Sequence, residues 1–259
     1  TVEEVKASKD PFVRQFVDGE ADAILDGVPQ IGLDAEGVRR VAEEELTKAS
    51  VRDIPIIAAS GSSAATTVAA TSHLAAMAGV RVFATGGLGG VHRGANESFD
   101  ESADLSTLAV TPITVVSAGV KSVLDIAATL ERLETLSVPV VGFGTSIFPS
   151  FWLRESEFTL DWSVDTAAEV AAIMRSQDEL GHGQGIVVAN PIPLDQQWDP
   201  TEHDRVLAEA LVLVHQELEP GCAGAGLAVG RGADHVDDRP ARGEAASCRR
   251  SGSSTGDRT

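Results

Sequence analysis

Short, continuous apolar segments alternate with longer amphipathic segments along most of the chain. The short segments predict buried strands and the longer ones predict helices, and this alternation is typical of a parallel sheet covered on both faces. We expect strands at 54–61, 80–87, 113–119, 138–145 and 185–191, and helices at 63–79, 121–136 and 165–180. The sequence therefore predicts an α/β protein with a mostly parallel sheet and helices on both faces, in a three-layer α/β/α arrangement.

The segments on either side of this alternating region have simpler patterns. Residues 21–33 predict two short strands around a Gly-Val-Pro turn, and 34–49 predict a helix with Asp34 as its N-cap. Lys48 would then interact with the carbonyl groups at the end of that helix. Residues 199–219 predict a capped amphipathic helix that ends near Glu219.

The composition of the chain changes after Pro220. The segment 221–259 is rich in Gly, Ala, Arg and Asp, contains no Lys, and shows no sustained helix or strand period. Such a segment cannot bury enough apolar surface to become ordered. We therefore expect residues 1–220 to form a single α/β domain, and 221–259 to be a disordered tail or the product of a shifted reading frame.

Composition and charge exclude several classes of function. The formal net charge of −19 argues against binding to nucleic acid or to an anionic membrane, because both partners require basic patches. No segment approaches the roughly 20 apolar residues of a membrane-spanning helix, and the first residues lack the layout of a signal peptide. We therefore expect a cytoplasmic protein. Both cysteines, Cys222 and Cys248, lie in the last forty residues and suggest neither a disulfide framework nor a zinc site.

Four glycines between residues 86 and 90 directly follow a predicted strand. Glycine lets backbone N–H groups approach a ligand closely, and ligands of open α/β sheets bind beyond the carboxyl ends of the strands. The spacing matches neither a phosphate-binding Walker loop nor a dinucleotide fingerprint. The residues alone leave both a structural turn and a phosphate cradle open.

The segment FDESAD follows these glycines and contains Asp100, Glu101 and Asp104. Clustered carboxylates suit a hard divalent cation such as Mg²⁺ or Mn²⁺, although a solvated acidic loop has the same pattern. His92 and Arg93, beside the glycines, could bind an anion.

Lys121 stands between the apolar strand at 113–119 and the helix predicted from 121 onward. Burial and the positive end of a helix dipole would both lower the pKa of its ammonium group and favour a neutral, nucleophilic amine. Such lysines form Schiff bases with carbonyl carbons. The alternative is a lysine that extends into solvent or pairs with Asp125.

Four stretches together carry a specific pattern: ASGSSAATTVAAT, RVFATGGLGGVHRGANESFDESADL, TVVSAGVKSVLDIAATLERLETLSVPVVGFGT and GIVVANPIP. From about residue 20 to about residue 219 the chain closely resembles the pseudouridine-5'-phosphate glycosidase family. The resemblance implies an α/β homotrimer that reversibly cleaves pseudouridine 5'-phosphate to uracil and ribose 5-phosphate with a divalent metal, typically Mn²⁺.

The resemblance also implies roles for individual residues. Lys121 matches the Schiff-base lysine of the family, and Asp100 matches its metal-binding aspartate. Asp104 would in addition move protons. The positions that match substrate-contacting or phosphate-contacting residues are Lys48, Val68, Thr85, His92, Ser102, Ala103 and Asp104.

Two parts of the family pattern differ in this chain. The family carries an N-terminal E-S-T type motif with a general-acid glutamate, followed by H-G-x-P, and neither occurs here. The segment after Pro220 stands where the family has a T-G-G region with a substrate-contacting asparagine, and Asn190 is a different position. Loss of a general acid costs about 10²–10⁴-fold in rate. Two alternatives therefore remain: a catalytically impaired phosphosugar-binding fragment of the family, and a Schiff-base lyase for another phosphosugar.

Overall fold

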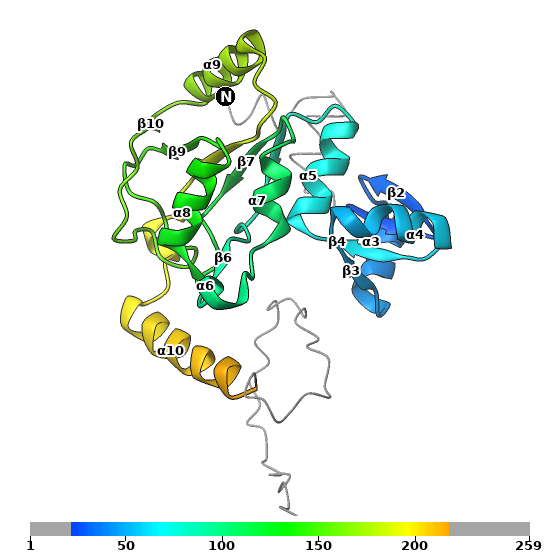
Figure 1. The fold of residues 1–259 in the computed structure, drawn as a ribbon, viewed down its shortest axis with the longest axis horizontal. Coiled ribbons are helices and arrows are strands. Elements are labelled where there is room, and N and C mark those ends of the chain that lie inside the picture. Colours follow the sequence, from blue (N-terminus) through cyan, green and yellow to red (C-terminus); the bar gives the residue numbers. More distant parts are fainter. Residues whose placement is uncertain (1–21, 218–259) are drawn as a thin grey trace, which may run out of the picture. The chain divides into compact units, whose positions relative to one another are not determined.

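The larger of the two main sheets, sheet B, has five parallel strands (Figure 1). The computed structural model describes residues 22–217, with side chains up to residue 212. The strand order is β10-β9-β11-β7-β5, and all neighbouring pairs are parallel. Its strands are β5 (Val82–Ala84), β7 (Thr114–Ser117), β9 (Val140–Phe143), β10 (Ser163–Val164) and β11 (Ile186–Ala189).

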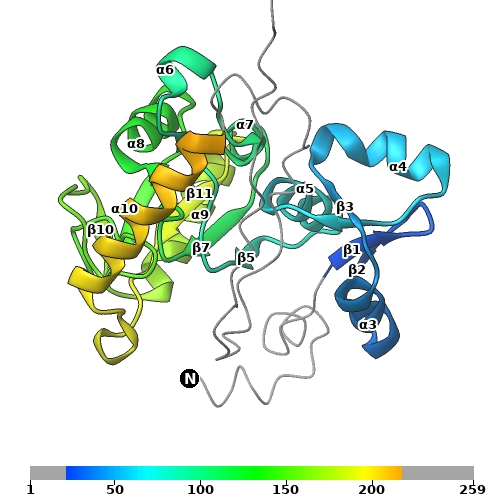
Figure 2. The ribbon, with the colours of Figure 1, turned by 90° about the horizontal axis from the view of Figure 1, so that it is seen from below.

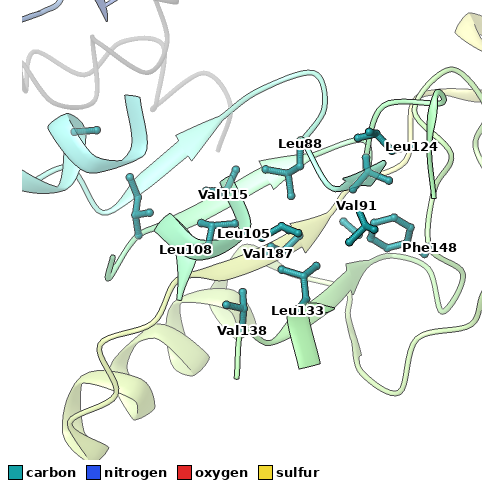
Figure 3. Close-up of a cluster of buried hydrophobic side chains, with 14 residues drawn as sticks. Leu88, Val91, Leu105, Leu108, Val115, Leu124, Leu133, Val138, Phe148 and Val187 are labelled. Atoms are coloured by element: carbon teal, nitrogen blue, oxygen red, sulfur yellow. The ribbon is translucent and has the colours of Figure 1, made fainter. Parts of the chain in front are cut away.

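Helices cover both faces of sheet B. On one face, Val115 and Val187 pack against α7 (Ala103–Leu108) and α8 (Ile126–Thr135) in the main apolar core, which Figure 3 shows. On the other face, Ile186 and Val188 pack against α9 (Ala167–Leu180). Neighbouring residues of β11 therefore point into different cores, which explains why its sequence is apolar throughout. The predicted three-layer α/β/α arrangement is confirmed.

A second, mixed sheet, sheet A, precedes sheet B in the sequence. Its order is β2-β1-β4-β3, with only β3 and β4 parallel. Helices α3 (Ala35–Glu43) and α4 (Ile54–Ser60) cover its two faces (Figure 2). Its strands are β1 (Asp22–Leu25), β2 (Val28–Ile31), β3 (Thr47–Ala49) and β4 (Ala64–Thr66), and α5 (Val68–Met77) follows β4.

The strand predicted at 54–61 is wrong, because these residues form α4. Ser50 and Asp53 make a capping box just before it, Pro55 lies in its first turn, and Gly61 ends it in the left-handed conformation. Only Ile57 is buried in α4, whereas Ile56 is 68% exposed. A short apolar segment cannot be assigned to strand or helix from periodicity alone, and here the flanking caps decide.

Three predicted boundaries also change. The first hairpin turns at Asp26 and Gly27, both in the left-handed region, so the turn is Asp-Gly and Val28 already belongs to β2. The helix predicted at 34–49 has Asp34 as its N-cap, as expected, but ends at Glu43. The helix predicted from 63 begins at Val68, after the short strand β4.

The remaining elements connect or flank the sheets. They are η1 (Val51–Asp53), β6 (Val91–His92), α6 (Ala95–Ser98), β8 (Leu124–Asp125), η2 (Leu194–Gln196) and α10 (Pro200–Glu217). Within 22–217, every helix is too short or too polar to cross a lipid bilayer. The expected tail at 221–259 and the helix end near Glu219 lie outside the described residues.

Candidate active site

The glycine-rich residues 86–92, here called the glycine segment, lie beside the loop that follows β7. The Leu88 N–H donates to the Gly119 carbonyl over 2.9 Å, and the Lys121 N–H donates to the Leu88 carbonyl over 3.1 Å. Farther along, His92 pairs with Leu124 between β6 and β8. The backbone of Lys121 is therefore held against the glycines at the carboxyl end of sheet B, where ligands of such sheets bind.

Residues 99–104, here called the acidic segment, lie against the opposite edge of the glycine segment. The His92 N–H donates to the Asp100 carbonyl over 3.0 Å, and the Ser102 N–H donates to the Gly90 carbonyl over 2.9 Å. The His92 Nδ1 lies 3.7 Å from an oxygen of the Asp100 carboxylate. The structure thus brings together Lys121, the glycines, His92, Asp100 and Ser102.

Asp104 joins these segments to the start of α5. Its side chain is buried, and its carboxylate accepts hydrogen bonds from the Gly89 N–H over 2.7 Å and the Ala69 N–H over 2.8 Å. Ala69 is the second residue of α5, where the helix dipole also favours a negative charge. Val68, the first residue of α5, is therefore close to the acidic segment.

Lys48 reaches this region from sheet A. It lies in β3, opposite Ala65 of β4. The side chain of Thr67 caps the start of α5, and the Thr67 N–H donates to the Ala49 carbonyl over 3.0 Å. The prediction that Lys48 interacts with the end of the preceding helix is wrong, because that helix ends at Glu43 and a strand follows. Strand β3 places Lys48 next to the α5 N-terminus instead.

Thr85 faces a cavity at the same edge of sheet B. The cavity has a volume of about 310 Å³ and is lined by residues at the carboxyl ends of β5 and β7 and by residues that follow β5, β7 and β11. Thr85 donates its N–H to the Val116 carbonyl over 3.0 Å, which holds it beside β7. Three further lining residues, which the sequence analysis did not assign to a site, are Phe151, Trp152 and Asn190.

Lys121 is not at a helix N-terminus. It lies in an exposed position before β8, and α8 begins only at Ile126, with the Asp125 side chain capping it. The Asp125 carboxylate accepts from the Ala128 N–H over 2.9 Å, so it serves the start of α8. The predicted helix start is wrong, and the expected burial of Lys121 is wrong as well, so neither burial nor a helix N-terminus acts on its amine. The structure agrees with the alternative in which Lys121 extends into solvent.

The expected cluster of three carboxylates does not form. Asp104 turns inward, the Glu101 carboxylate pairs with Arg132 over 2.8 Å, and the Asp100 side chain is 61% exposed. Across 22–217 no group of three or more His, Cys, Asp or Glu side chains is arranged to hold a metal ion. The residues therefore fit a divalent cation only if Asp100 supplies one oxygen and water or substrate supplies the other ligands.

A family model described as "Indigoidine synthase A like protein" matches residues 17–224 of the chain. The chain belongs to this family. A curated relative from Frankia alni, named pseudouridine-5'-phosphate glycosidase, is 62% identical over 190 residues, which are 73% of this chain and 53% of the relative. A relative of the same name from Salinispora tropica is 60% identical over 195 residues, or 74% of this chain and 60% of the relative. The resemblance seen in the sequence is thereby confirmed.

Two solved structures share the indigoidine synthase A-like fold. One is the prealnumycin C-glycosynthase AlnA in complex with ribulose 5-phosphate, with a TM-score of 0.71 and 35% identity over 76% of this chain and 65% of that chain. The other is an indigoidine synthase A-like protein from Thermotoga maritima, with a TM-score of 0.68 and 38% identity over 73% of this chain and 63% of that chain. This indigoidine synthase A-like chain spans roughly half to three fifths of the first curated relatives' length.

Some features of the chain distinguish Phe151, Trp152 and Asn190, the cavity-lining residues to which no role was assigned from the sequence of this family member. Phe151 and Trp152 are adjacent aromatics in a chain with only 4% aromatic residues. Phe151 has a φ of 60°, a strained backbone for a bulky residue, and its ring lies so close to Gly87 that a Cβ there would be 2.5 Å away. Asn190 directly follows β11 and therefore belongs to the ligand-binding edge.

Replacing Asp104 by asparagine should destabilise the chain by about 1–3 kcal/mol, because an amide NH₂ would face one of the two buried N–H donors. Urea unfolding followed by circular dichroism measures the change. The control is Glu97→Gln, an exposed carboxylate in the same region, which should stay within about 0.5 kcal/mol of the original chain. Equal stability of Asp104→Asn and Glu97→Gln would show that the Asp104 contacts do not hold the segments together.

Proposed function

We propose that this chain carries the site of an enzyme that reversibly cleaves pseudouridine 5'-phosphate to uracil and ribose 5-phosphate through a Schiff base on Lys121. The observation that carries the proposal is the meeting of an exposed lysine, the glycine segment and the acidic segment at the carboxyl end of sheet B. The names of the 60–62% identical relatives support the reaction. The ribulose 5-phosphate complex of AlnA supports a phosphosugar as the substrate class.

In the proposed reaction, the Lys121 amine bonds to C1' of the ribose as the C1'–O4' bond breaks and O4' takes a proton. The C1'–C5 bond to uracil then breaks, C5 takes a proton, and the lysine nitrogen forms a C=N bond to C1'. Water hydrolyses this Schiff base and releases ribose 5-phosphate. Carbon is a poor leaving atom, and the nitrogen electron pair of the covalent lysine adduct makes its departure possible.

The other residues of the proposal would bind the substrate or the metal. Thr85, His92 and the N–H groups of the glycine segment would bind the phosphate, and Lys48, Val68, Ser102 and Ala103 would contact the sugar. Asp104 would hold the glycine segment, and its role in proton transfer stays a prediction. Asp100 would supply one oxygen to Mn²⁺, which would neutralise charge on the substrate when bound. The resemblance further supports a homotrimer in the cytoplasm, and light scattering would test the trimer.

Uracil release from pseudouridine 5'-phosphate, measured by chromatography with and without added Mn²⁺, tests the proposal. The alternative of a catalytically impaired phosphosugar-binding fragment predicts that calorimetry detects ribose 5-phosphate binding while no uracil appears. The alternative of a lyase for another phosphosugar predicts a Lys121 adduct with ribose 5-phosphate but no uracil release. Uracil formation by the chain would contradict both alternatives.

A further inference from the structure

We propose that His203 is a positioning residue for Lys121 and acts through the hydroxyl group of Ser122. The inference rests on the proposed function in one respect, the covalent reaction of Lys121. Residues 118–123, here called the lysine loop, connect β7 to β8 and contain both Lys121 and Ser122. His203 lies 81 residues farther along the chain, in α10.

The contact between α10 and the lysine loop is polar and partly buried. The His203 side chain is 4% exposed, and its Nε2 lies 3.0 Å from the Ser122 Oγ. Its Nδ1 lies 3.1 Å from the Asp204 carboxylate, and the Trp198 ring meets the imidazole edge-on with centroids 6.0 Å apart. An Nδ1–H that donates to Asp204 leaves Nε2 to accept the Ser122 O–H, so both ring nitrogens are satisfied.

The contact with His203 can affect the position of Lys121 because Ser122 is the next residue in the chain. The Lys121 N–H is bonded to Leu88, and the Lys121 carbonyl accepts from the Leu124 N–H over 3.0 Å. The backbone is therefore fixed on both sides of Lys121, and the His203 bond fixes the side chain of the next residue. Because the amine itself faces solvent, its direction depends on the loop that carries it. Misplacement of a reacting group by about 1 Å can cost roughly 10²-fold in rate.

Ser122, His203 and Asp204 are also the residue types of a hydrolytic triad. In such a triad the aspartate is buried and orients the imidazole. The Asp204 side chain is instead 75% exposed, and the serine lies next to the exposed lysine. The geometry therefore favours positioning of Lys121 over nucleophilic attack by Ser122.

The test follows the formation of the borohydride-trapped Lys121 adduct with ribose 5-phosphate by mass spectrometry. In His203→Ala and in Ser122→Ala, the rate at saturating ribose 5-phosphate should fall about tenfold, with little change in the half-saturating concentration. His203→Gln should recover most of the rate, because its amide can still bond to Ser122. The double variant should be no slower than either single variant, since both remove the same contact. Glu209→Gln, at an exposed ion pair on the same helix, is the control and should keep the original rate.

Several outcomes would overturn the inference. They are an unchanged rate in Ser122→Ala, multiplied losses in the double variant, or a change only in the half-saturating concentration. Circular dichroism checks that each variant is folded. If His203→Ala does not fold, the adduct rate of Ser122→Ala, which removes a single oxygen atom, tests the inference by itself. A lack of adduct in the original chain would overturn the proposed function together with the inference. A normal adduct rate in the original chain and in all variants would overturn the inference alone.

Discussion

Replacing Lys121 by alanine is expected to abolish the adduct that borohydride traps with ribose 5-phosphate, and to lower uracil release by at least about 10³-fold, as loss of other covalent nucleophiles does. The reason is that Lys121 would supply the nitrogen atom that forms the covalent bond to C1' of the ribose. Lys121→Arg should be equally inactive, because a guanidinium stays protonated and does not form the Schiff base. Mass spectrometry of the reduced protein and chromatography of uracil measure both effects.

Lys48 provides the matched control, since it is the other lysine among the described residues. Lys48→Ala should weaken the binding of ribose 5-phosphate but still form the adduct at high concentration. If Lys121→Ala retained the adduct, or if peptide mapping placed the adduct on Lys48, the assignment of the nucleophile would be wrong.

Four of the five strands of the central sheet could be predicted because each is marked by a local apolar pattern, whereas the two-residue strand β10 was not predicted. Val187 packs on one face of the sheet while Ile186 and Val188 pack on the other, so β11 is apolar at every position. Sheet A carries a weaker pattern. Its strands β3 and β4 have three residues each, and the most apolar segment near them is a helix with one buried side chain. Apolar content alone therefore misplaced the strand.

The positions of the site residues depend on contacts that the sequence does not reveal. In FDESAD, three carboxylates look equivalent, but only Asp104 turns inward. Two N–H donors decide this, those of Ala69 and Gly89, which are 35 and 15 residues away. The helix after Lys121 starts late for a local reason, since the Asp125 carboxylate caps α8 at Ala128. The sequence thus identified segments that meet in the structure, and their packing determines which side chains turn inward and which are exposed.

The glycines of the site have a packing role that the sequence suggested only as a phosphate cradle. A Cβ at Gly89 would collide with the Ser102 side chain and would lie 2.8 Å from the Asp104 carboxylate. A Cβ at Gly90 would collide with Thr129, whose Oγ accepts from the Val91 N–H over 2.9 Å. The absence of side chains therefore allows the glycine segment to approach the acidic segment and α8 closely.

Gly89→Ala should consequently destabilise the chain by about 3 kcal/mol or more, at the upper end of the cost of overpacking a buried site. The added methyl group must displace Ser102 and stretch the bond between Asp104 and the Gly89 N–H. Activity should fall by at least roughly 10²-fold as well, because the backbone that holds Lys121 through Leu88 moves with Gly89. Urea unfolding measures the first effect, and the rate of the Lys121 adduct measures the second.

Two further glycines show whether the effect is specific to this contact. A Cβ at Gly183 would meet open space, so Gly183→Ala should leave both stability and adduct formation within error of the original chain. A Cβ at Gly86 would be 3.7 Å from the Phe151 ring, an ordinary contact, so Gly86→Ala should change the free energy of unfolding by less than about 0.5 kcal/mol. If Gly89→Ala behaved like these two, the close approach of the glycine segment to Ser102 and Asp104 would not be needed for folding or for the site. If only Gly89→Ala lost stability and adduct formation, the lack of a side chain at Gly89 would be shown to set the spacing of the segments around Lys121.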